Sequence, residues 1–178
     1  YEEEIDRVVY DCYPLHPAST FILPRLSERV AQNERTLFTF ISAKGDATLS
    51  SFLAQHEDDE FALATPDLIY DYFEPLLKQE AYSGNLHKYY TLTSSILRKI
   101  DASSLEAKIV KTLALIYILE HFEKIKPTLD DLTGIYSYYG ADAVNEAVKR
   151  LVEDKYVVYL KKSNNYLRLK ETSGVDVR

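Results

Sequence analysis

The last third of the chain carries the pattern that most restricts the fold. Three segments have helical apolar spacing, and two shorter segments rich in Val, Tyr and Leu follow them. Serine or threonine precedes the first two helical segments, which is typical of helix N-caps. A short polar loop separates the last two segments, as in a β-hairpin. The pattern therefore predicts helices at 104–122, 129–135 and 141–153 and strands at 156–161 and 166–170.

The order of these elements is that of a winged helix. In such a domain the last helix is the recognition helix and the hairpin forms the wing. Gly140 supplies a turn before the third helix, and the hairpin signal agrees with this order independently. We therefore expect a winged-helix domain at 103–171, followed by a polar tail at 172–178.

Helix signals dominate residues 1–102. Thr65, Pro66 and Asp67 combine a capping hydroxyl, a proline suited to the first helical turn and a carboxylate at the positive end of the helix dipole. Residues 86–100 place apolar side chains at three-and-four spacing, which indicates an amphipathic helix. The predicted fold class is mainly α, with a helical bundle at 1–102 and then the winged helix with its small β-hairpin.

The charge of the chain is distributed unevenly. Residues 1–122 contain 11 Lys and Arg against 19 Asp and Glu, whereas residues 123–178 contain 10 against 9. The acidic first part repels nucleic acid, and the nearly neutral second part is at best permissive for it.

The cations of the predicted winged helix are the candidates for nucleic-acid binding. The recognition helix is close to neutral and lacks the array of Arg, Lys, Asn and Gln that reads base edges. The wing is richer in cations, although wings that bind proteins look similar. The candidates are Lys149, Arg150, Lys161, Lys162, Arg168 and Lys170. Binding of DNA and binding of protein both remain open at this point.

No pattern for catalysis or metal binding is present in the sequence. The five glycines are isolated, and no serine lies in a Gly-x-Ser-x-Gly motif. The four histidines have no paired spacing for zinc. The acidic run at 56–60 is interpreted as a solvated loop rather than a cation site. The sequence therefore predicts no catalytic residue, no metal and no cofactor in this chain, which we expect not to be an enzyme.

The location predicted from the sequence is cytoplasmic. A single cysteine, Cys12, excludes an internal disulfide and suits a reducing compartment. The first ten residues are too charged for a secretory leader. The longest apolar run, 113–119, is far shorter than the ~20 residues that span a bilayer, so we expect no membrane association. Because the first residue already lies in a charged amphipathic segment, we expect the chain to be a piece of a longer polypeptide.

Arg35 is the residue of the first part with the clearest chemical potential. It falls in the first turn of a predicted helix for which Asn33 is the N-cap. A guanidinium held there can be presented to phosphate oxygens. The alternative is an ion pair with a neighbouring carboxylate at a helix contact. His16, between two prolines, is interpreted as a hydrogen-bonded turn residue.

Three runs of residues resemble a segment that follows the nucleotide-binding core in large bacterial P-loop ATPases of the AAA+ and STAND type, many of them associated with phage defence. The runs are Tyr13-Pro14-Leu15-His16-Pro17, Leu23-Pro24-Arg25-Leu26-Ser27 and Gln32-Asn33-Glu34-Arg35-Thr36-Leu37-Phe38. Beyond residue 41 the resemblance is architectural, since a helical lid followed by a winged helix is similar to the origin-recognition branch of these ATPases.

This resemblance implies a role for the chain as part of a larger ATPase. Residues 1–102 would be a lid-like subdomain, and Arg35 would contact the γ-phosphate of ATP. The parent protein would bind ATP and Mg²⁺, and the partner of this chain would be the upstream nucleotide-binding domain of the same polypeptide. The Walker A and Walker B motifs are absent, so the chain should neither bind nor hydrolyse ATP alone.

Three hypotheses about function follow. The first is a non-catalytic regulatory fragment, lid and winged helix, which couples the nucleotide state of a P-loop ATPase to contact with a partner or with DNA. The second is a stand-alone winged-helix module that binds DNA through the wing. The third is an adaptor whose tyrosines bind a protein partner, because tyrosine is favoured at interfaces. The tyrosines concerned are Tyr136, Tyr138, Tyr139, Tyr156 and Tyr159.

Overall fold

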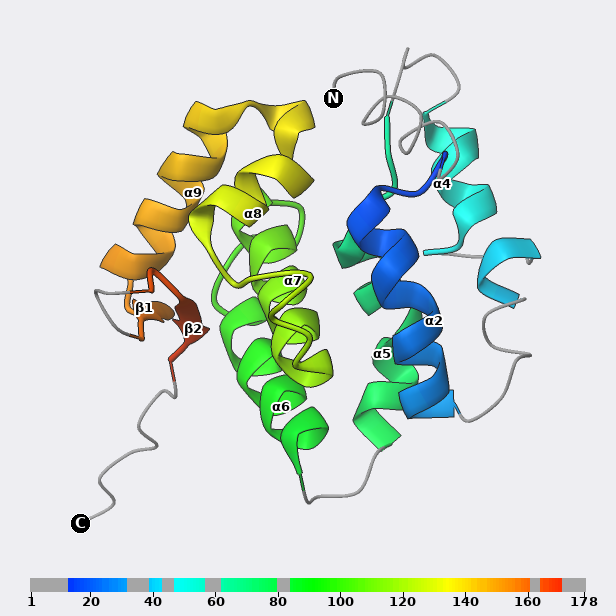
Figure 1. The fold of residues 1–178 in the computed structure, drawn as a ribbon, viewed down its shortest axis with the longest axis horizontal. Coiled ribbons are helices and arrows are strands. Elements are labelled where there is room, and N and C mark those ends of the chain that lie inside the picture. Colours follow the sequence, from blue (N-terminus) through cyan, green and yellow to red (C-terminus); the bar gives the residue numbers. More distant parts are fainter. Residues whose placement is uncertain are drawn as a thin grey trace. The chain divides into compact units, whose positions relative to one another are not determined.

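The computed structural model describes residues 13–31, 39–42, 47–56, 62–79, 84–160 and 164–170. These ranges are mainly helical and include a two-stranded antiparallel sheet. This confirms the predicted fold class, a helical bundle with a small β-hairpin. Contacts divide the chain into two compact units, residues 1–80 and 81–178. Figure 1 traces the helices and strands of each unit.

The described part of the first unit is helical. It contains α2 (Pro17–Ala31), α4 (Leu49–Gln55) and α5 (Pro66–Gln79). Helices α2 and α5 pack against each other, and the fully buried side chains of Leu26, Ile69 and Phe73 lie on them. Helix α5 begins at Pro66, as predicted, and the hydroxyl of Thr65 donates to the carboxylate of Asp67.

Residues 13–17, at the start of the described chain, form a corner that is hydrogen-bonded to the segment just before α5. Leu15 forms a parallel bridge with Ala64, just before α5. The backbone N–H of His16 donates to the carbonyl of Ala64 at 3.0 Å, and the Ser19 hydroxyl donates to the same carbonyl at 2.7 Å. The Nδ1 atom of His16 accepts from the N–H of Ala18 at 3.0 Å, which satisfies a donor of the first turn of α2. His16 is therefore a hydrogen-bonded turn residue, as expected.

The described part of the second unit contains four helices, a short 3₁₀ turn and the hairpin. Their bounds are α6 (Asn85–Leu97), α7 (Leu105–Leu119), α8 (Leu129–Ile135), η1 (Ser137–Tyr139), α9 (Ala141–Glu153), β1 (Val157–Tyr159) and β2 (Leu167–Leu169). Helices α8 and α9 have the predicted bounds, and α6 and α7 each end three residues earlier than predicted. The strands are shorter than predicted.

Helix α7 is the centre of the second unit. Its start is capped by Ser104, whose hydroxyl accepts from the N–H of Ala107 at 3.2 Å, and it ends at Glu120, which has a positive φ of 57°. It contacts α6, α9 and β2. Its buried side chains occur on all sides of the helix, because neighbours cover it all round. The helix is therefore the core element of the second unit.

The hairpin is attached to the helices through β2. Val157 pairs with Leu169, and Tyr159 pairs with Leu167. The N–H of Leu167 donates to the carbonyl of Pro127 at 2.7 Å, and the carbonyl of Leu167 accepts from the Tyr117 hydroxyl at 2.6 Å. The side chains of Val157, Leu167 and Leu169 are buried. One face of the hairpin is therefore part of the core, and the opposite face is turned away from it.

Helix α6 packs with the predicted winged helix. The Asn85 side chain donates to the carbonyl of Tyr117 at 3.2 Å, and the rings of Tyr89 and Tyr117 stack with centroids 5.2 Å apart. The sequence predicts a domain boundary at 102–103, whereas the compact units divide between residues 80 and 81. The signals at 101–103 mark a turn between two packed helices, in which the Asp101 carboxylate accepts from the N–H of Ser103 at 2.9 Å.

Candidate interaction surface

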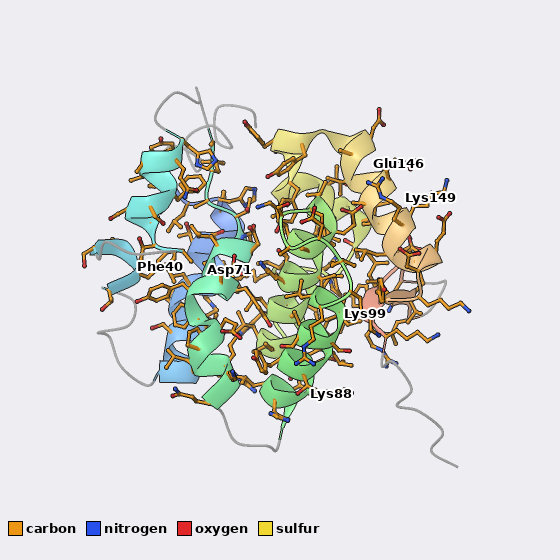
Figure 2. All side chains as sticks on the ribbon, turned by 180° about the vertical axis from the view of Figure 1, so that it is seen from behind. Phe40, Asp71, Lys88, Lys99, Glu146 and Lys149 are labelled. Carbon is orange, nitrogen blue, oxygen red and sulfur yellow. The ribbon has the colours of Figure 1, made fainter. Side chains whose placement is uncertain are left out.

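Helix α9, the predicted recognition helix, has a buried side and an exposed side. The buried side consists of Val144, Ala147, Val148 and Leu151. Asp142, Glu146, Lys149 and Glu153 are all exposed, and their spacing places them in one row along the opposite side. We call this row the α9 outer stripe. Figure 2 labels Glu146 and Lys149 on this helix.

Arg150 follows Lys149 on α9 and is also exposed, and its guanidinium forms an ion pair with an acidic side chain. The Nε atom of Arg150 donates to Oε1 of Glu106 in α7 at 2.6 Å. The Glu106 side chain is 17% exposed and the Arg150 side chain 58% exposed, so the pair is shielded from solvent on the Glu106 side only. The pair neutralises Arg150. The α9 outer stripe itself then carries three carboxylates against one ammonium group, that of Lys149.

Two exposed tyrosines lie just before α9. The side chains of Tyr138 and Tyr139 are 63% and 44% exposed, and their rings meet edge to face with centroids 5.4 Å apart. We call them the tyrosine pair. Gly140, whose φ of 86° suits glycine, connects the pair to α9. The tyrosine pair and Asp142 therefore belong to one continuous stretch of surface.

The remaining predicted interface tyrosines differ in exposure. Tyr136 is fully buried, and its hydroxyl is 2.6 Å from Oγ1 of Thr112 and donates to the carbonyl of Lys108 at 3.0 Å. Tyr136 is thus a core residue that joins α8 to α7. Tyr156 is half-buried, and Tyr159 is 46% exposed.

The predicted nucleic-acid residues of the wing are described only in part. Arg168 lies in β2 opposite Val158, and Lys170 follows the strand and is exposed. Lys161 and Lys162 lie outside the described residues, as does Arg35 in the first unit. The structure brings Arg168 and Lys170 onto the hairpin and places Lys149 and Arg150 on α9.

The positive charge of Arg168 in β2 affects the pKa of Tyr117 in α7. Burial raises the pKa of Tyr117 to about 12, the neighbouring Tyr89 contributes to the rise, and the positive charge of Arg168 opposes it. The Tyr117 hydroxyl stays protonated at neutral pH and can donate its hydrogen bond to Leu167. The hydrogen bond from the Tyr117 hydroxyl to Leu167, which attaches the hairpin to α7, is therefore kept over the ordinary range of pH.

An open cleft of about 670 Å³ lies between the start of α8 and the hairpin. Its polar groups serve local structure: the Asp131 carboxylate accepts from the N–H of Lys126 at 2.7 Å, and the Asn164 side chain accepts from the N–H of Tyr166 at 3.1 Å. The cleft is lined by Lys126, Thr128, Leu129, Asp130, Asp131, Tyr159, Asn164, Asn165 and Tyr166. Nothing in this lining forms a recognisable catalytic arrangement.

Two kinds of feature, a metal-binding cluster and a membrane-spanning helix, are absent from the described residues. No group of three or more His, Cys, Asp or Glu side chains among them is placed to hold a metal ion. Within the same ranges, none of the helices has the length and apolar character needed to cross a membrane.

Comparison of the chain with models of protein families, with curated proteins and with solved structures gave no significant match. The resemblance to P-loop ATPases therefore rests on the three runs at 13–38 and on the order of the elements.

Two residues with long-range contacts in the second unit, Glu106 and Lys99, could not be identified from the sequence. Glu106 looks like an ordinary first-turn acid of α7, and its partner Arg150 is 44 residues away. Lys99 follows the end of α6, and its Nζ atom lies 6.0 Å from the centroid of the Tyr156 ring. Both contacts are long-range, so no local pattern could have indicated them.

Proposed function

We propose that residues 105–170 form a winged helix and that its α9 outer stripe and tyrosine pair bind a protein partner. The order α7, α8, α9, β1 and β2 supports the winged-helix assignment. The hydrogen bond from the N–H of Leu167 to the carbonyl of Pro127 supports it as well, because it ties the segment between α7 and α8 to β2. The interaction is assigned to α9 because this is the recognition helix of such domains.

The observation that carries the choice of protein over DNA is the ion pair between Arg150 and Glu106. A helix that reads the major groove needs Arg, Lys, Asn or Gln facing the base edges and cations facing the phosphates. The pair neutralises Arg150 and leaves Lys149 as the one cation of the α9 outer stripe beside three carboxylates. Such a surface repels a phosphate backbone and attracts basic groups.

The tyrosine pair indicates the chemistry of the partner. Tyrosine side chains supply a large apolar area with a polar tip, and they are enriched at the centres of interfaces. Arginine and lysine side chains stack favourably on such rings. Asp142 and Glu146, which follow the tyrosine pair on α9, are exposed and offer carboxylates to the same basic groups. The partner is therefore a protein surface or segment rich in Arg or Lys.

Photo-crosslinking tests this assignment. A crosslinking amino acid in place of Tyr139 is compared in cells with the same amino acid in place of Tyr159, which is almost equally exposed at 46% against 44%. We expect a defined protein product from position 139 that survives nuclease treatment. The product should be lost when Asp142→Lys and Glu146→Lys are added. Equal products from both positions, or products that nuclease removes, would contradict the proposal.

We also propose the larger role that the resemblance implies, with both units acting as the lid and winged helix of a cytoplasmic P-loop ATPase. The three runs support it, and so does the corner in which Leu15 and His16 pair with Ala64, because a lid that transmits a nucleotide signal must move as one body. The single cysteine supports the cytoplasmic location.

A substitution of Arg35 tests this larger role. In the longer polypeptide, Arg35→Ala should lower ATP hydrolysis at least about tenfold, since arginines that contact the γ-phosphate stabilise the charge that develops during transfer. Arg29→Ala, at the exposed end of α2, is the matched control and should leave hydrolysis unchanged. Hydrolysis at the normal rate in the Arg35 variant would exclude the sensor role.

A further inference from the structure

The cleft between the start of α8 and the hairpin is a surface of the second unit that the proposed α9 interaction does not use. None of the residues that line it belongs to the α9 outer stripe or to the tyrosine pair. It is bordered by α8, β1 and β2, which Figure 1 labels. Its volume of about 670 Å³ lies within the range of roughly 300–1,000 Å³ that is typical of small-molecule sites. Its lining combines two tyrosines with acids, amides and a lysine.

One of the two tyrosines is anchored in a row of aromatic side chains. The ring of Tyr166 packs on that of Phe122, with centroids 5.9 Å apart, and Phe122 packs on Tyr117 of α7 at 5.5 Å. The other tyrosine, Tyr159, lies on the same face of β1 as the buried Val157, yet it is 46% exposed. The cleft therefore offers one fixed ring and one accessible ring.

The polar groups of the lining fall into two sets. Asp131 and Asn164 each use one oxygen to accept from a backbone N–H, at 2.7 and 3.1 Å, which fixes the plane of the carboxylate and of the amide. The carboxylate keeps further acceptor sites, and the amide keeps both of its donors. In the described part of the chain, no hydrogen bond or ion pair engages the side chains of Lys126, Asp130 and Asn165. Donors and acceptors are therefore both available in the cleft.

We propose that this cleft binds a neutral saccharide. Each hydroxyl group of a sugar both donates and accepts hydrogen bonds, so a sugar needs donors and acceptors in the same site. The carboxylate of Asp131 and the amide of Asn164 supply both in fixed orientations. The C–H face of a sugar ring is apolar and packs on an aromatic ring, for which Tyr159 and Tyr166 are available. The cleft thus supplies the two kinds of contact that a saccharide requires.

The charges of the lining favour a neutral ligand over a charged one. Asp130 and Asp131 repel phosphate and carboxylate groups, and the ammonium group of Lys126 repels cations. A hydroxyl group forms hydrogen bonds with all three side chains, because it donates to a carboxylate and accepts from an ammonium group. Saccharide binding at this cleft is independent of the protein partner proposed for α9.

Ligand-observed NMR on the full chain tests this proposal. Saturation-transfer difference spectra are recorded with glucose, maltose and N-acetylglucosamine, and isothermal titration calorimetry gives the dissociation constant. We expect at least one of these sugars to bind, with the strongest saturation transfer at the C–H protons on one face of its ring. Tyr159→Ala should weaken its binding at least about tenfold because the accessible ring is lost. Asp130→Ala should also weaken it at least about tenfold, because a hydrogen bond to a charged group is lost.

The matched controls are Leu160→Ala and Glu28→Ala. Leu160 follows Tyr159 in the chain, is 40% exposed and does not line the cleft, and Glu28 is an exposed acid of α2. Both control variants should bind the sugar as the unmodified chain does, and circular dichroism checks that all four variants remain folded. The proposal is overturned if none of the three sugars binds, if adenosine binds and the sugars do not, or if the controls lose as much affinity as the Tyr159 and Asp130 variants.

Discussion

Replacing Leu113 with alanine should lower the free energy of unfolding of the second unit by about 2–5 kcal/mol, since a buried leucine truncated to alanine loses its transfer free energy and leaves a cavity. Leu113 is completely buried in α7, the helix that contacts α6, α9 and β2. The α9 surface proposed to bind a protein therefore depends on it. Chemical denaturation followed by tyrosine fluorescence and circular dichroism measures the change, and the chain contains no tryptophan to obscure the tyrosine signal.

Leu160→Ala is the matched control for this prediction. Its side chain is 40% exposed just after β1, so the same truncation should change the free energy of unfolding by less than about 0.5 kcal/mol. A similar loss of stability in both variants would mean that α7 is not the core of the unit. Unchanged stability in the Leu113 variant would lead to the same conclusion.

Neutralising the acids around α9 should create duplex affinity where the native surface resists it. The variant Glu106→Gln, Asp142→Asn and Glu146→Gln releases Arg150 from its ionic partner and removes two carboxylates from the α9 outer stripe. Affinity for a duplex at low salt should rise at least about tenfold, and the salt slope should become steeper by one or two, because additional phosphate contacts become available. Anisotropy titration against the unmodified chain provides the comparison.

The control for this gain changes the net charge equally in the first unit. Glu28→Gln, Asp71→Asn and Glu74→Gln also remove three carboxylates, and all three residues belong to the first unit. This control should raise affinity much less than the α9 variant does. If the two triple variants gain affinity equally, net charge alone determines binding, and the ion pair between Glu106 and Arg150 has no particular role.

The local part of the fold could be predicted from the sequence. The starts of α5, α7 and α8 follow from Thr65-Pro66, Ser104 and Thr128, because capping hydroxyls and a first-turn proline act on the backbone within three residues. The hairpin follows from two Val-, Tyr- and Leu-rich runs, although each strand is shorter than its run.

The arrangement of charges and the division into units could not be predicted in this way. Helix α6 joins the second unit through contacts of Asn85 and Tyr89 with Tyr117, far along the chain. The sequence of α9 suggests that Arg150 is an unpaired cation. Only the packing of α7 against α9 brings Glu106 to it. The contact of Lys99 with the Tyr156 ring likewise depends on the end of α6 reaching the start of the hairpin. These are consequences of packing between distant segments, which local patterns do not encode.

The central claim is that α9 binds a protein and not a nucleic-acid duplex. Mapping of backbone amide chemical shifts by NMR on the isotope-labelled chain, with a short duplex added at low salt, tests it most directly. We expect almost no changes in the row from Asp142 to Glu153. Changes concentrated in α9 would contradict the claim, because the helix would then contact the nucleic acid that its charge is proposed to repel.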